Sequence, residues 1–275
     1  MAQTKRFLSA ETQSRNERIA LLVSGPGALV GFIVGWFVLC GFVPTPSATR
    51  SGQFIAEYYR HRGEIRMMSG IIITTLSGNL LCLWLILMAL QVRRIEGRWG
   101  VLSLGAILLG SMNTMLFMVS SIFLLEPAFR PELPPDTILA VWDLGMLFFY
   151  QPAYNAVIEL VLVAVAIFQD RRPDPVFPRW TGYFTLGVTG IFSIFIIEPY
   201  FKTGPLSWTG AIGFWVALSA YFVWLIVETV CMFRAGYSGS DSQGHVATSS
   251  HPIKNLEERL DALRADIDAI STQRA

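Results

Sequence analysis

Long apolar stretches separated by short polar ones dominate the chain. Six of them are long enough to cross a hydrocarbon core of about 30 Å, which takes roughly 20 residues of helix. They cover approximately residues 19–43, 67–92, 101–125, 144–168, 181–201 and 209–233. No stretch has the alternating polarity that is typical of a membrane-barrel strand. The pattern therefore predicts an all-α polytopic membrane protein with a six-helix transmembrane bundle.

The polar segments divide the chain into four predicted parts. These are an N-terminal segment (1–18), the transmembrane domain (19–234), a flexible Gly/Ser-rich linker (235–251) and an amphipathic C-terminal helix (252–275). The first apolar run is longer than the about 7–15 apolar residues of a cleaved signal peptide. We therefore expect it to be a retained helix.

The fourth apolar segment is too long for one straight crossing. Asp136 follows Pro134 and Pro135, so we expect a helix to begin there with an acidic first turn. Pro152 predicts a kink further along. Residues 138–146 are then predicted to lie at the outer interface, before the chain enters the bilayer.

Composition supports the membrane prediction and excludes several other classes. The chain is 53% hydrophobic and 15% charged, whereas soluble domains carry about 25% charged residues. Its 21 basic and 20 acidic residues nearly cancel, so nucleic acid is not an expected partner. Cys40, Cys82 and Cys231 all fall in apolar runs without a CxxC motif. We expect no disulfide framework, no metal site and no cofactor.

The distribution of Lys and Arg predicts the orientation. Short loops on one side contain Arg93, Arg94, Arg98, Arg171, Arg172 and Arg179, whereas those on the other side contain Arg130 and Lys202. Because basic residues concentrate on the cytoplasmic side, both termini are predicted to be cytoplasmic in a multi-pass protein of the cell membrane.

The first loop is an exception to this rule. It is predicted to be external, yet it contains Arg50, Arg60, Arg62 and Arg66, partly offset by Glu57 and Glu64. Residues 53–66 are predicted to form an interfacial helix with Phe54, Ile55, Tyr58 and Tyr59 facing lipid. The prediction of six crossings requires this basic loop to lie outside the cytoplasm.

A polar cluster is predicted near the middle of the membrane. Asn79, Asn113 and Asn155 with Glu159 lie at similar depths on three helices, and Gln151, Asn155 and Glu159 form one stripe. An ionisable group at that depth marks a functional site, so Glu159 is the main binding or proton-coupling candidate. The alternative is that these side chains only hydrogen-bond neighbouring helices.

Two further charged groups are weaker candidates. Arg60 and Arg62 are predicted to face Asp143 on the outer surface, where they would bind an anionic headgroup or a polar substrate, or act as a solvated anchor. Glu228 is predicted to form an ion pair with Arg234 or with an arginine of the loop before helix five.

Two patterns predict packing or assembly. Gly27, Gly31 and Gly35 allow a helix to approach closely, with a neighbour in the same chain favoured. In the C-terminal helix an a/d seam of three- and four-residue spacings predicts a coiled coil, antiparallel if it pairs with itself. The seam consists of Ile253, Leu256, Leu260, Leu263, Ile267 and Ile270. It would serve a homo-oligomer or another protein partner; the alternative is docking on the membrane or on its own bundle.

These features favour a non-enzymatic protein that binds or transports a small or amphipathic molecule at the midplane cluster. An intramembrane acid/base enzyme acting on a lipid or isoprenoid, with Glu159 as the proton carrier, is the first alternative. A membrane scaffold that assembles partners through the C-terminal helix is the second. The sequence contains no HExxH, GxSxG or Walker-type motif.

Overall fold

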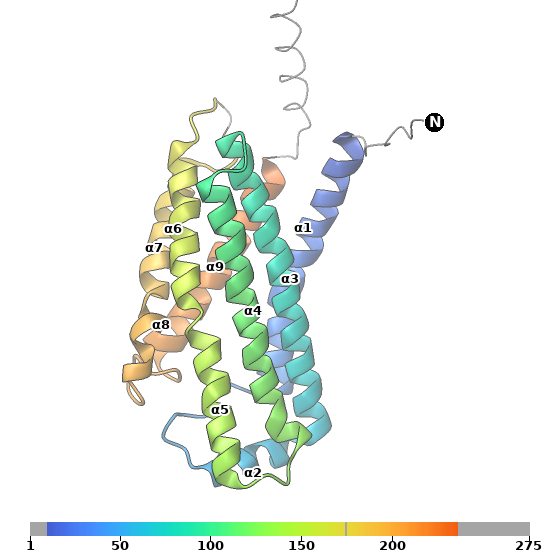
Figure 1. Ribbon diagram of the computed structural model, residues 1–275, viewed down its shortest axis with the longest axis vertical. Helices are drawn as coiled ribbons and strands as arrows, with labels where there is room; N and C mark the ends of the chain where they lie inside the picture. The colour runs from blue at the N-terminus through green and yellow to red at the C-terminus, as the bar shows by residue number, and fades with distance from the viewer. Residues whose placement is uncertain (1–9, 174, 236–275) are drawn as a thin grey trace, which may run out of the picture. The chain divides into compact units, whose positions relative to one another are not determined.

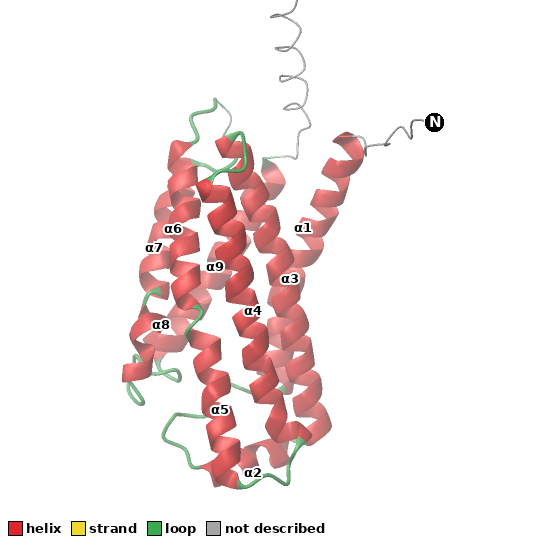
Figure 2. Ribbon diagram, viewed as in Figure 1, coloured by secondary structure: helices red, strands yellow, loops and turns green. Residues whose placement is uncertain are grey.

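The computed structural model describes residues 10–173 and 175–235, and within these ranges it contains only helices and loops (Figure 2). Residues 17–236 group into one compact unit, and residues 1–16 and 237–275 into another, of which only 10–16 are described. Six segments are long and apolar enough to cross a membrane: Ser14–Leu39, Glu64–Glu96, Val101–Phe129, Pro135–Gln169, Arg179–Tyr200 and Ala211–Arg234. The prediction of an all-helical, multi-pass membrane protein is confirmed.

Several of these segments are assembled from more than one helix. In chain order the elements are α1 (Ala10–Phe32), the π-helix η1 (Ile33–Leu39), α2 (Gly52–Arg62), α3 (Glu64–Glu96), α4 (Val101–Phe129), α5 (Pro135–Tyr150), α6 (Ala153–Gln169), α7 (Arg179–Phe192), α8 (Ile194–Ile197), the 3-10 helix η2 (Glu198–Tyr200), the π-helix η3 (Ala211–Val216) and α9 (Ala217–Arg234). Only α3 and α4 run through their segments as single helices (Figure 1).

The predicted kink at Pro152 is the break between α5 and α6. Proline has no N–H to donate to the preceding turn, and α5 ends at Tyr150 while α6 begins at Ala153. Helix α5 continues roughly in line with α6 and packs along α4 (Figure 1). Ser120 of α4 donates a hydrogen bond to the carbonyl of Gly145 at 2.7 Å. The two helices together form one 35-residue segment.

Helix α2 forms where an interfacial helix was predicted, but its aromatic face points the other way. Ile55 and Tyr59 are buried, and the Tyr59 hydroxyl donates to the carbonyl of Leu124 at 2.8 Å. The Tyr58 hydroxyl donates to Gly41 at 2.7 Å. The prediction that this face contacts lipid is wrong, because the phenol groups find backbone acceptors within the bundle.

The glycines of α1 lie against α3 of the same chain. A Cβ added at Gly27 would lie 2.9 Å from Leu80, and one at Gly31 would lie 2.9 Å from Ser77. At Gly35 it would overlap the backbone of Gly70 and the side chain of Thr74. Small residues thus let α1 and α3 approach closely, as they do in other membrane bundles.

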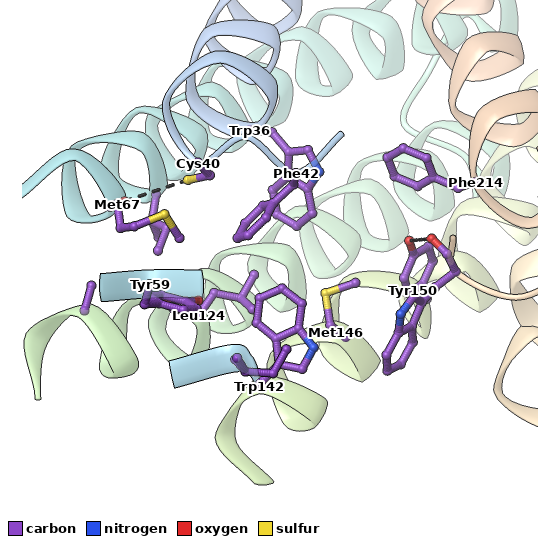
Figure 3. Packing of buried hydrophobic residues seen from close by; sticks show 14 of the residues in the cluster. Trp36, Cys40, Phe42, Tyr59, Met67, Leu124, Trp142, Met146, Tyr150 and Phe214 are labelled. Carbon is purple, nitrogen blue, oxygen red and sulfur yellow. Dashed lines mark hydrogen bonds between the residues drawn. The ribbon is translucent and has the colours of Figure 1, made fainter. Parts of the chain in front are cut away.

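Aromatic side chains dominate the core on the α2 side of the bundle. Phe42 packs between Trp36 and Trp142, with ring centroids 4.7 and 5.4 Å away (Figure 3). Tyr150 stacks on Trp208 and donates its hydroxyl hydrogen to the carbonyl of that residue at 3.1 Å. The Trp208 indole in turn donates to Pro46 at 2.9 Å. This network ties the first and last loops of the bundle to α5.

Candidate functional site

An aromatic cavity of about 100 Å³ lies within the bundle. Its walls come from α1, α3, α4, α5, α6, α7, α8, η3 and α9. Nine of the lining residues are aromatic: Phe32, Phe117, Phe149, Tyr150, Phe192, Phe195, Phe214, Tyr221 and Phe222. Such walls favour apolar or aromatic groups, which they contact by edge-to-face and stacked packing.

Helix irregularities converge on this cavity. Phe32 immediately precedes η1, and Phe214 lies within η3. Pro152 at the α5–α6 break lines the wall, as do Phe192 and Phe195 on either side of the α7–α8 break. Interrupted helices within a membrane occur where backbone is buried in protein or lines a cavity, and π-helical turns are frequent at functional sites. The sequence predicted only one of these four irregularities, at Pro152.

Two polar groups at the cavity have no partner in the described residues. Neither the Asn113 carboxamide nor the Tyr221 hydroxyl makes a side-chain hydrogen bond there. The other polar groups are already engaged with backbone carbonyls: Ser77 with Thr74 at 2.6 Å, Thr114 with Gly110 at 3.1 Å, and Tyr150 with Trp208. A largely apolar wall therefore carries one free amide and one free hydroxyl.

Glu159 lies beside the cavity and does not line it. The side chain is buried, and its Oε1 has no hydrogen-bond partner among the described residues. It packs against the backbone of α4 at Gly110, where an added Cβ would lie 2.8 Å from Oε1. Tyr221 is close enough to interact electrostatically with the carboxyl group. The carboxyl group therefore lies near the cavity without being one of its lining groups.

The structure does not bring the predicted midplane residues into one cluster. Asn79 is exposed on the outside of α3, and its amide donates to the carbonyl of Thr75 at 3.1 Å. Asn155 is half-buried on α6, and Gln151 at the α5–α6 break has a buried amide nitrogen without a partner in the described part. Asn113 alone among these residues lines the cavity. The expectation that Asn79 shares a site with Glu159 is wrong, because similar depth does not fix the direction in which a helical side chain points.

The outer-surface candidates are also separated. Asp143 is half-buried on α5, and the charged group that influences it is Lys202. The Arg62 guanidinium lies over the Tyr58 ring and reaches the carbonyl of Gly41 at 3.5 Å. Arg60 is exposed. Neither arginine forms an ion pair with Asp143 among the described residues.

Glu228 is fully buried, and the predicted interfacial ion pair is absent from the described residues. Thr185 donates to its Oε1 at 3.2 Å, and the Trp224 indole donates to the Thr185 hydroxyl at 3.0 Å. The arginine of the α6–α7 loop pairs instead with its neighbour, since Arg172 contacts Asp170 at 2.8 Å. The prediction paired Glu228 with arginines because they are the nearest basic residues in the sequence. Nothing in the sequence indicated that Thr185 of α7 would be its partner.

No group of three or more His, Cys, Asp or Glu residues that could hold a metal ion occurs within residues 10–173 and 175–235. The predicted linker and the C-terminal seam lie outside the described residues, apart from Ala235.

No family model matches the chain, and neither a curated protein nor a solved structure is significantly similar to it.

Proposed function

We propose that this multi-pass membrane protein binds a small amphipathic molecule in the aromatic cavity. The observation that carries the proposal is an apolar cavity with two unsatisfied polar groups, Asn113 and Tyr221, on its wall. A ligand with a ring-sized apolar part would fill the space. A carbonyl or hydroxyl on the same ligand would pair with the amide and the phenol, and each such hydrogen bond contributes about 0.5–1.5 kcal/mol.

The interrupted helices favour transport over catalysis. Discontinuous membrane helices commonly form the substrate site of transporters, because their ends present free backbone groups and permit local rearrangement. Glu159 is not among the residues that line the cavity, whereas Tyr221, which interacts with it electrostatically, is. A proton-coupled role for Glu159 is therefore a more natural hypothesis than general acid/base catalysis, which requires hydrogen-bond reach to the reacting atom.

Cavity filling tests the binding proposal. Leu218 lines the cavity, whereas Val223 is 50% exposed on the same helix. We expect the purified wild-type protein to carry a small amphiphile that solvent extraction and mass spectrometry identify. The Leu218→Trp variant should lose it, because the indole occupies the same space, and Val223→Trp should retain it.

A finer variant tests the polar contact. Asn113→Leu should weaken binding of the identified amphiphile about 2- to 10-fold, the range expected for losing one hydrogen bond. Equal amounts of the same molecules in the wild type, Leu218→Trp and Val223→Trp would show that they are carried on the outer surface and would contradict the proposal.

A further inference from the structure

An open groove lies at the junction of α2 and α3 and shares no lining residue with the aromatic cavity. Its walls include Arg60, Arg66, Glu64 and Ser69, together with the apolar residues Leu39 and Ile65. Two guanidinium groups against one carboxylate give this groove a net positive charge. The cavity proposal uses none of these residues.

The basic groups of the groove are available to a ligand. The Arg60 side chain makes no ion pair or hydrogen bond in the described part of the chain. Arg66 donates one N–H to the carbonyl of Val38 at 2.8 Å, which orients the guanidinium and leaves its other N–H groups free. Gly63 precedes α3 without a side-chain cap, so the first N–H groups of that helix add to the positive potential.

The position of the groove matches the headgroup level of a bilayer. Leu39 is the last residue of the first membrane-spanning segment, and Glu64 is the first residue of the second. Lipid phosphates lie at this boundary between the hydrocarbon and water. A phosphate in the groove would therefore belong to the same layer as the surrounding lipids.

An aliphatic stripe leads from the groove along α3 toward the bilayer interior. Ile65, Ile72 and Leu76 are 78%, 58% and 59% exposed. Their spacing of seven and then four residues places them on one face of the helix. A lipid whose phosphate occupied the groove would lay an acyl chain along this stripe, whereas a soluble phosphate would leave it uncovered.

We infer that the groove binds an anionic glycerophospholipid, with its phosphate between Arg60 and Arg66 and one acyl chain along the α3 stripe. The net positive charge favours an anionic headgroup over a zwitterionic one, and a basic residue near a membrane surface contributes about 1 kcal/mol to such binding. The bound lipid also accounts for Arg60 and Arg66, two of the four first-loop arginines that do not follow the charge bias of the remaining loops.

Lipid titration of the purified full-length protein, followed by native mass spectrometry, tests this site. The probes are phosphatidylglycerol, phosphatidylcholine and soluble glycerol 3-phosphate. We expect a preference for phosphatidylglycerol that falls about fivefold in Arg60→Gln, the change equivalent to one such contact. Arg98→Gln, an equal charge change at the opposite end of α3, should retain the preference. Leu218→Trp should also retain it, which separates this site from the cavity.

Three outcomes would overturn the inference. Equal affinity of the wild type for the two lipids would exclude a headgroup site, and equal losses in Arg60→Gln and Arg98→Gln would place the effect in overall charge. Full competition by glycerol 3-phosphate would identify a soluble anion as the ligand. Arg60 contacts no other side chain through a hydrogen bond or ion pair in the described residues, so Arg60→Gln should fold normally.

Discussion

Burial controls the chemistry of Cys40, which follows the first membrane-spanning segment. The thiol is fully buried and donates a weak hydrogen bond to the carbonyl of Met67 at 3.8 Å. Burial raises its pKa to about 12, although Arg62 and Arg66 act in the opposite direction by favouring the thiolate. Because the thiolate is the reactive form, this cysteine should be inert at neutral pH despite two nearby arginines.

We therefore predict slow alkylation of Cys40 in the folded protein. With a pKa of about 12 against 9.0 for an unperturbed thiol, the thiolate fraction at pH 8 is about a thousandfold smaller than in the denatured chain. Labelling by iodoacetamide in a Cys82→Ala, Cys231→Ala background should show that difference by mass spectrometry. The folded-state rate should increase with pH up to about 12. Equal labelling of folded and denatured protein at pH 8 would contradict the burial described here.

The sequence predicted how far along its helix each polar residue lies, but not which side of the helix it occupies. Asn79 and Asn113 both lie in the middle of long apolar helices, yet Asn113 lines the cavity and Asn79 faces outward. The buried sides of α3 and α4 contain small and hydroxyl residues, such as Thr74 and Ser77 of α3 and Thr114 of α4, because small side chains let membrane helices approach one another. An asparagine in the middle of such a helix does not by itself show whether it lies on that side.

The sequence predicted the helix break that a proline causes, but it gave no signal for the other helix irregularities. Pro152 indicated the α5–α6 break, but η1 and η3 contain no proline. In η1, Gly35 packs against the backbone of Gly70, and Trp36 and Phe37 pack into the aromatic core. These contacts come from distant parts of the chain. Local patterns in the sequence therefore predicted the number of spans and the break at Pro152, but not η1 and η3.

The α1–α3 interface gives a graded prediction among glycines. An added methyl group at Gly35 would overlap backbone atoms of α3, which cannot move aside, whereas at Gly27 it meets only the flexible end of Leu80. Gly35→Ala should cost about 1–3 kcal/mol of stability, the range for overpacking a tight contact, and Gly27→Ala should cost less. Gly190→Ala is the control, because nothing lies within 4 Å of its added Cβ.

Thermal unfolding of the three variants in one detergent measures this order. The Gly35→Ala protein should unfold at the lowest temperature, and Gly190→Ala should match or exceed the wild type, since alanine favours helix over glycine. Similar unfolding temperatures for Gly35→Ala and Gly190→Ala would show that α1 and α3 do not pack as closely as the structure indicates.

At the scale of the whole molecule, six spans require both ends of the bundle to emerge on the same side of the membrane. The short loop after α3 contains Arg98, and the loop after η2 contains Lys202, so successive crossings place these two loops on opposite sides. Basic residues then predict that Arg98 is cytoplasmic. The Tyr59 hydroxyl donates to the carbonyl of Leu124, so α2 lies at the same end of the bundle as the C-terminal part of α4, and the predicted orientation makes that end external.

Reporter fusions after Arg98, Lys202 and Ala275 would test this topology. Alkaline phosphatase, which is active only outside the cytoplasm, should be active after Lys202 and inactive after Arg98 and Ala275. A fluorescent protein that folds in the cytoplasm should give the reverse pattern. Phosphatase activity after both Lys202 and Ala275 would mean an odd number of crossings. Activity after Arg98 with none after Lys202 would retain six crossings but invert the protein, and would place the arginines of the α2–α3 groove at the cytoplasmic leaflet.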